Sequence, residues 1–119
     1  MSLETRNHID GAWRAGSARS ENRNPSDTSD LIGLYEQADI DQVDEAIAAA
    51  RRAQREWAAV GIERRHDILM AIGRELMARA GEIGTMLSRE EGKPLAEGRG
   101  EVYRAGQFFT YFAAEACGR

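Results

Sequence analysis

The sequence predicts a mostly helical α+β chain, with an amino-terminal β-hairpin and one short strand followed by three amphipathic helices. Three observations lead to this class. Asp10-Gly11 stands between apolar residues, which is the strongest short-range signal for a tight hairpin. Apolar residues then recur with a helical period from Asp41 onward, and Gly61 and the pair Gly92 and Pro94 divide that pattern into three segments.

The amino-terminal third is divided by its turn residues. We expect a β-hairpin over residues 7–16, centred on Asp10-Gly11. Residues 17–30 are polar and rich in turn formers, and Pro25 disfavours a helical conformation at the residue before it, so this stretch is predicted to be a loop. The short apolar run Leu31 to Glu36 is predicted to be a strand.

Residues 31–118 therefore hold the strand and three helices, and the whole chain, 1–119, is interpreted as one partial domain. Asp39 or Asp41 caps the first helix, which Gly61 ends. The second begins near Ile62 and runs to Gly92, and Pro94 suits the first turn of the third. The expected inward residues of the first helix are Val43, Ala46, Ile47, Ala50 and Trp57.

Composition excludes several classes of protein. The formal charge is −4 and basic residues alternate with acidic ones, so a nucleic-acid partner is not expected. No apolar run approaches the roughly 20 residues that span a bilayer, so no membrane partner is expected either. The single cysteine, Cys117, permits no intrachain disulfide, and a cytoplasmic location is expected.

The segment "LSREEGKPLAEGRGEV", residues 87–102, raises the question of chemistry. Gly92 and Pro94 are explained by the end of one helix and the start of the next. Gly98 and Gly100 each cost about 1 kcal/mol inside a helix, so we expect close packing against both. The acidic residues here, Glu90, Glu91, Glu97 and Glu101, are more typical of solvated helix charges than of a general acid–base pair.

No catalytic or cofactor-binding residue is predicted in this chain. Cys117 lies near the carboxyl end of a helix, where the dipole disfavours a thiolate, and is interpreted as an inert apolar residue. His8 and His66 have no metal-ligand spacing. Neither a phosphate loop nor a dinucleotide fingerprint occurs.

Five stretches occur in an order that resembles one family: "HIDGAW", "NPSDTSDLIG", "DIDQVDEAIAAARRAQREW", "RRHDILMAIGRELMARAGEIGTMLSREEGKPLAEGRGEV" and "FFTYFAAEA". Together they cover about His8 to Ala116 and resemble the amino-terminal segment of the NAD(P)-dependent aldehyde dehydrogenase superfamily. Within it, the chain is most similar to α-ketoglutaric semialdehyde (2,5-dioxopentanoate) dehydrogenases, followed by succinate-semialdehyde dehydrogenases.

The resemblance implies that the chain is part of an α/β cofactor-binding domain. It implies a parent enzyme that oxidises a semialdehyde to a carboxylic acid with NAD or NADP, through a cysteine thiolate and oxyanion-stabilising groups. Those groups follow Arg119 in the family. The 119 residues alone are therefore expected to be inactive and to bind no cofactor, with the rest of the dehydrogenase chain and other copies, as a homo-oligomer, as partners.

The resemblance also implies one ligand set. Family members hold a structural monovalent cation at positions that correspond here to Asn22, Arg23 and Glu101, although the usual acid is aspartate and not glutamate. The alternative for Glu101 is a solvated carboxylate with no ion. The alternative for the whole chain is a free-standing helical interaction module without enzymatic activity, because the apolar stripes of its helices would serve a partner as well as a core.

Overall fold

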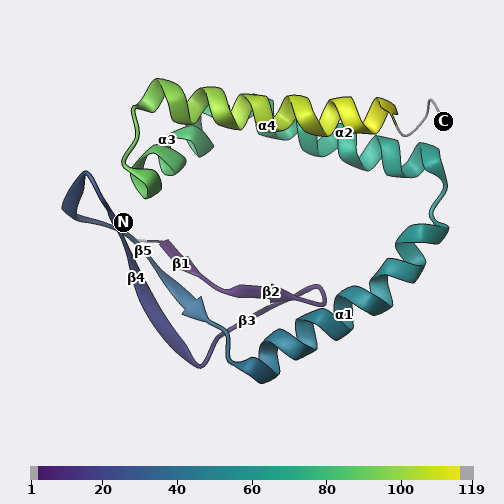
Figure 1. Cartoon of the computed structure of the whole chain (residues 1–119), viewed down its shortest axis with the longest axis horizontal. Coiled ribbons are helices and arrows are strands. Elements are labelled where there is room, and N and C mark those ends of the chain that lie inside the picture. The colour runs from purple at the N-terminus through teal and green to yellow at the C-terminus, as the bar shows by residue number, and fades with distance from the viewer. Residues whose placement is uncertain (1–2, 116–119) are drawn as a thin grey trace. The chain divides into compact units, whose positions relative to one another are not determined.

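The computed structural model describes residues 3–115, so Cys117 lies outside the described residues. The chain forms two compact units, residues 1–59 and 60–119, and each is described by itself below. The predicted class is confirmed: short strands come first and helices follow (Figure 1). The chain that the sequence predicts to be one partial domain thus contains two compact units.

The first unit contains five strands and one helix. Strand β5 lies between β1, which is parallel to it, and β4, which is antiparallel, while β2 and β3 pair as a separate hairpin. The elements are β1 (Leu3–Thr5), β2 (Asn7–Ile9), β3 (Ala12–Arg14), β4 (Ala18–Asn24), β5 (Asp27–Gln37) and α1 (Ile40–Ala59).

The predicted hairpin of residues 7–16 is present as β2 and β3. Asp10 and Gly11 form its turn with φ angles of 51° and 77°. Positive φ at both central residues is the geometry that a two-residue hairpin turn requires, and aspartate and glycine tolerate it best. The local sequence is therefore sufficient to specify this turn.

The predicted loop over residues 17–30 is wrong. Strand β4 and the beginning of β5 occupy it, joined by a tight turn in which Asn24 Oδ1 accepts a hydrogen bond of 2.9 Å from the Ser26 N–H. Both strands are polar here, so no alternation of apolar residues marked them. Pairing with the apolar part of β5 around Ile32, which is fully buried, holds this polar stretch as a strand.

Helix α1 packs against the β2–β3 hairpin through polar pairs. Arg14 Nη1 lies 2.7 Å from Glu45 Oε1, Asn7 Nδ2 donates to Gln42 Oε1 at 2.6 Å, and Arg52 Nη2 lies 3.1 Å from Asp10 Oδ2. Asp39 is the amino-terminal cap, since its Oδ1 accepts a hydrogen bond from the Gln42 N–H. Of the two predicted caps, the structure selects Asp39.

The face that α1 buries differs from the predicted one. Its buried residue is Ala49, whereas Val43, Ile47 and Trp57 are 41%, 48% and 42% exposed. The predicted stripe was read from the helical period, which marks an apolar face but does not name the element that covers it.

The second unit consists of three helices, so the chain has four described helices instead of the predicted three. They are α2 (Ile62–Ala78), α3 (Ala80–Glu91) and α4 (Leu95–Glu115). The predicted second helix is divided at Arg79, which has φ −99° and ψ 15°. The helical period continues across Arg79, and the tight packing of α3 on α4 accounts for the change of direction.

Helices α2 and α4 approach closely at two glycines. A Cβ atom on Gly73 would lie 2.7 Å from the Gly106 carbonyl oxygen, and one on Gly106 would lie 2.7 Å from the Gly73 carbonyl oxygen. Each glycine therefore provides the space in which the backbone of the other helix lies.

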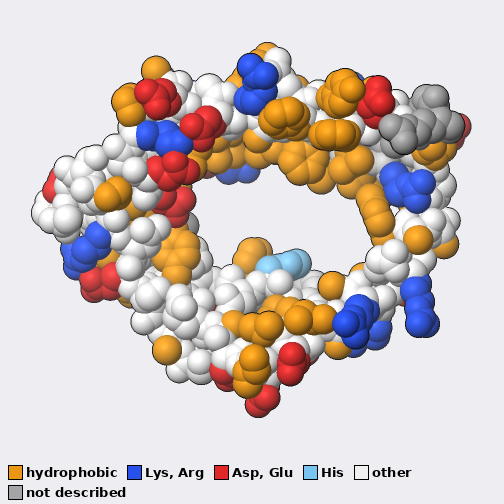
Figure 2. All heavy atoms as spheres, in the orientation of Figure 1, with side chains coloured by type: hydrophobic (Ala, Val, Ile, Leu, Met, Phe, Trp, Pro, Cys, Tyr) orange, Lys and Arg blue, Asp and Glu red, His pale blue; other side chains and the backbone are white. Residues whose placement is uncertain are grey.

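The described residues form a small core, and large apolar side chains remain at the surface. Phe108 and Phe112 on α4 are 56% and 59% exposed, and Figure 2 shows hydrophobic side chains gathered over α4. Among the described residues, no helix combines the length and the apolar character that crossing a bilayer requires.

Candidate functional site

The segment between α3 and α4 is the candidate site that the sequence singled out. Gly92 ends α3 in the left-handed conformation, with φ 68° and ψ 23°, and its N–H donates to the Ser88 carbonyl. The Lys93 N–H donates to the same carbonyl at 3.1 Å, and the Pro94 carbonyl accepts from the Gly98 N–H at 3.2 Å. Glycine is the usual residue in this position after a helix, so the backbone follows from the sequence.

Lys93 forms two ion pairs at this junction. Its Nζ lies 2.5 Å from Glu91 Oε2 and 2.6 Å from Glu101 Oε1, and its side chain is only 16% exposed. The hydrogen bond to Glu101, followed by that to Glu91, raises the pKa of Lys93 above its ordinary value. The amine is therefore held in its charged form, which cannot act as a base or as a nucleophile.

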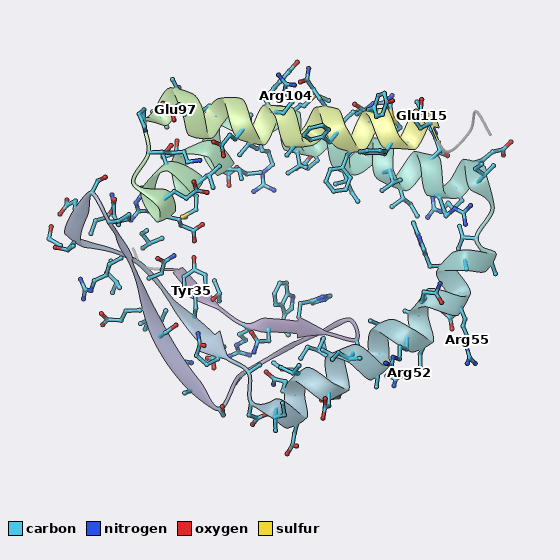
Figure 3. All side chains as sticks on the ribbon, in the orientation of Figure 1. Tyr35, Arg52, Arg55, Glu97, Arg104 and Glu115 are labelled. Carbon is cyan, nitrogen blue, oxygen red and sulfur yellow. The ribbon has the colours of Figure 1, made fainter. Side chains whose placement is uncertain are left out.

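The carboxylates of this segment do not form an acid–base pair. Glu91 and Glu101 both contact the Lys93 ammonium, which lies between them. Glu97 is exposed at the start of α4 (Figure 3). The carboxylates of Glu91 and Glu101 are therefore both engaged as acceptors of one ammonium group.

The two unexplained glycines of the segment have different surroundings. A Cβ atom on Gly98 would lie 2.3 Å from Ser88 Oγ and 2.6 Å from the Gly84 carbonyl oxygen. The predicted close packing is confirmed at Gly98. It is wrong at Gly100, where a Cβ atom would have no neighbour within 4 Å.

The residues of the predicted cation site lie on two elements. Asn22 and Arg23 are in β4, where the pairing with β5 shifts register, and Glu101 is on α4 in the other compact unit. The Arg23 guanidinium donates to Glu21 Oε2 at 2.9 Å and to the Thr28 carbonyl at 3.1 Å. Glu101 is paired with Lys93.

The histidines have separate local partners. The His8 ring lies 4.6 Å from the Trp13 ring, measured between centroids, and His66 Nδ1 lies 3.1 Å from Asp67 Oδ1. Within residues 3–115, no group of three or more histidine, cysteine or acidic side chains is close enough to hold a metal ion.

Among the described residues, one strand leads directly into a helix, at the connection from β5 to α1. A dinucleotide site requires a strand, a glycine-rich turn and a helix that begins at the pyrophosphate. Helix α1 follows β5 through Ala38 and Asp39, and the carboxylate at its cap repels an anion. The β5–α1 connection therefore differs from that arrangement.

Sequence reasoning missed the polar contacts that join distant elements. Glu36, which is 5% exposed, accepts from the Gly16 N–H at 2.7 Å and pairs with Arg19 at 2.7 Å. These contacts lower the pKa of Glu36, with the Gly16 N–H as the largest cause. Nothing in the local pattern distinguished Glu36 or Lys93 from other surface charges.

Comparison with known proteins shows what the chain is similar to. A sequence model described as the aldehyde dehydrogenase family matches residues 13–118. The chain is 43% identical over 95 residues to N-succinylglutamate 5-semialdehyde dehydrogenase of Burkholderia orbicola. This match covers 79% of this chain and 19% of that protein. The chain is 31% identical over 118 residues to α-ketoglutarate semialdehyde dehydrogenase of Haloferax volcanii, covering 98% of this chain and 24% of that protein.

Solved structures share the fold. An NAD-dependent aldehyde dehydrogenase from Sinorhizobium meliloti superposes with a TM-score of 0.91 at 24% identity, covering 97% of this chain and 24% of that one. An aldehyde dehydrogenase from Brucella melitensis gives a TM-score of 0.89 at 33% identity, covering 95% and 24%. The chain thus spans about a fifth to a quarter of the length of the proteins it matches.

Proposed function

Because this chain belongs to the aldehyde dehydrogenase family, we propose that it is the amino-terminal part of an NAD(P)-dependent enzyme that oxidises a semialdehyde to a carboxylic acid. The observation that carries this proposal is the sequence identity of 43% with a semialdehyde dehydrogenase over 79% of the chain. The parent enzyme would be a cytoplasmic homo-oligomer.

The role of residues 1–119 in that enzyme is a scaffold. The charged Lys93 and the capped α3–α4 junction stabilise a helix pair, and neither supplies a nucleophile or a base. The thiolate, the oxyanion-stabilising groups and the cofactor cradle would then belong to other parts of the parent chain. We expect these 119 residues to be inactive by themselves.

The experiment compares this chain with the product of the complete reading frame. Each is mixed with N-succinylglutamate semialdehyde, α-ketoglutarate semialdehyde or succinate semialdehyde, with NAD and NADP separately, and NAD(P)H formation is followed. We expect reduced cofactor from the complete product and none from the 119-residue chain. A complete product that reduces neither cofactor with any of these aldehydes would contradict the proposal.

The scaffold role has its own test in the complete product. Gly98→Ala should reduce the yield of folded enzyme because its Cβ would meet Ser88 and the Gly84 carbonyl. The enzyme that does fold should retain its kcat and KM. Gly100→Ala, which introduces a Cβ into open space, is the matched control. A lowered kcat at unchanged folded yield would indicate a part in catalysis.

The cation site at Asn22, Arg23 and Glu101 remains a prediction from the resemblance. The Lys93–Glu101 pair favours the ion-free alternative, because an ammonium already neutralises this carboxylate. Thermal denaturation of the complete product in sodium, potassium and choline chloride distinguishes the two. A cation site predicts higher stability in sodium or potassium that Glu101→Gln removes.

The second candidate function is a free-standing interaction module. The observation that favours it is the exposure of Phe108 and Phe112, at 56% and 59%. A reading frame that ends at Arg119 in the gene, with no cofactor reduction by its product, would favour this candidate over the dehydrogenase.

A further inference from the structure

The turn of the β2–β3 hairpin contains a chemically labile pair of residues. Asp10 is followed by Gly11, and no other aspartate or asparagine in the sequence is followed by glycine. The backbone nitrogen that follows an aspartate can attack the side-chain carboxyl group, and a side chain on the following residue hinders that approach. Gly11 has no side chain, and a Cβ atom placed on it would have no neighbour within 4 Å. Steric hindrance therefore does not protect this peptide bond.

The tip of the hairpin is also loosely packed against its own unit. Asp10 and Gly11 are both exposed, and together with α1 they line a hollow of about 320 Å³. The α1 residues that line this hollow are all alanines: Ala46, Ala49, Ala50 and Ala53. Such small side chains make few contacts with the tip, so local opening of the turn displaces no large side chain of α1.

The closed turn opposes the attack in two ways. Asp10 has a φ of 51°, and a residue in the left-handed region has a ψ of about +47°. At that ψ the Gly11 nitrogen lies on the opposite side of the Cα–C bond from the Asp10 side chain, whereas the attack requires both on the same side. Arg52 adds a restraint, because its Nη2 lies 3.1 Å from Asp10 Oδ2. The attack therefore requires that the turn opens and that this ion pair breaks.

We propose that Asp10 is a site of isoaspartate formation and that Arg52 limits the rate by holding the turn closed. When the turn opens, the Gly11 nitrogen forms a bond with Asp10 Cγ and loses its proton, and one carboxyl oxygen leaves as water. Water then cleaves the five-membered ring. Cleavage at the backbone carbonyl carbon leaves the chain connected through Cγ and makes that carbonyl a free carboxylate. One water is released and one is consumed, so the mass of the protein does not change.

The rearrangement changes the hairpin because it adds the Asp10 Cβ to the backbone of the turn. A two-residue turn pairs Ile9 with Ala12, and a longer backbone no longer fits that register. Ile9 is only 7% exposed, so the change affects a buried residue. The new carboxylate is attached to Cα and no longer extends toward Arg52. The modified hairpin is therefore expected to pack less closely on α1.

Peptide analysis of the complete reading-frame product tests this proposal, and its readout is independent of the dehydrogenase proposal. The protein is incubated in mildly acidic buffer and digested with trypsin, which releases residues 7–14 as one peptide because Arg6 precedes it and Arg14 ends it. The isoaspartate form has the same mass and a different retention time, whereas deamidation of Asn7 changes the mass. Incubation in heavy-oxygen water before digestion labels the molecules that have passed through the ring.

Arg52→Gln should raise the rate of isoaspartate formation by roughly two- to fivefold, which is the range that an exposed ion pair accounts for. Arg55→Gln is the matched control. Arg55 extends from the same helix (Figure 3) and carries the same charge, but it forms no ion pair among residues 3–115. This variant should leave the rate unchanged. Asp10→Glu should abolish the reaction at this position, because the ring would need six members.

The protein unfolded in urea provides the reference rate. There the turn is absent, and isoaspartate should form faster than in the folded protein. Far-UV circular dichroism shows that each incubated variant is folded, so that a faster rate is not caused by global unfolding. Equal rates in the folded and unfolded protein would overturn the proposal. Equal rates in Arg52→Gln and Arg55→Gln, or a folded protein that forms no isoaspartate at Asp10 even in Arg52→Gln, would also overturn it.

Discussion

Lys93 Nζ lies 2.6 Å from Glu101 Oε1, which joins the residue just beyond the cap of α3 to the second turn of α4. On the inner side of the same junction, Gly98 lies so close to α3 that a Cβ atom would meet Ser88 Oγ at 2.3 Å. An ion pair thus joins α3 and α4 at this junction. The absence of a side chain at Gly98 also allows the two helices to pack closely.

Replacing Lys93 should lower the melting temperature of the chain. Lys93→Gln removes the ammonium that neutralises Glu91 and Glu101 and leaves two carboxylates facing each other. Thermal denaturation followed by circular dichroism measures the change. Arg104→Gln is the matched control, because Arg104 points away from α2 (Figure 3) and forms no ion pair among residues 3–115.

The effect of Lys93 should also depend on pH. Because its pKa is raised in the folded chain, its stabilisation is present below the ordinary value of 10.5 and is lost as the pH rises through the folded value. The difference in melting temperature between the native chain and Lys93→Gln should therefore shrink at strongly alkaline pH. A difference that stays constant there would contradict the assignment.

Two glycines only two residues apart should respond oppositely to alanine. Gly98→Ala should destabilise the chain by about 1–3 kcal/mol, because its Cβ would overlap Ser88 and the Gly84 backbone. In Gly100→Ala the new Cβ atom has no neighbour within 4 Å, so the substitution should stabilise the chain by about 1 kcal/mol through helix propensity. Urea denaturation of the two variants measures both values, and equal effects would show that the α3–α4 contact is looser than described.

Glu36 should titrate below its ordinary pKa of 4.5. The Gly16 N–H is the largest cause of the lowered pKa, and Arg19 adds to it. Stability from this group is present above the ordinary value and is lost as the pH falls through the lower folded value. Carboxyl chemical shifts measured by NMR across acidic pH check the pKa. Arg19→Gln should raise it only in part, since the Gly16 hydrogen bond remains.

The aromatic surface of α4 should bind a hydrophobic dye in the native state. Leu69, Phe108, Phe109 and Phe112 line a hollow of about 200 Å³. Phe112→Ser should reduce the fluorescence of bound anilinonaphthalene sulfonate while leaving the far-UV spectrum unchanged, because Phe112 is 59% exposed. Ile62→Ser, which removes an exposed apolar residue outside this hollow, should leave the fluorescence unchanged.

Local chemistry determined much of this chain. Asp10-Gly11 specifies its turn because both positions need positive φ, and Gly92 ends α3 for the same reason. The apolar period located the helices, and the order of the motifs identified the family. Each of these signals depends on residues that are near one another in the sequence.

The tertiary structure decided what those local signals leave open. Strand β4 is polar and exists because β5 pairs with it, and the helical period runs through Arg79 although the helix breaks there. Gly98 and Gly100 look alike in sequence, yet only Gly98 lies against another helix. Hydrophobic periodicity shows which face of an element is apolar. Whether that face is buried depends on a partner distant in the sequence, and only the folded chain brings the two together.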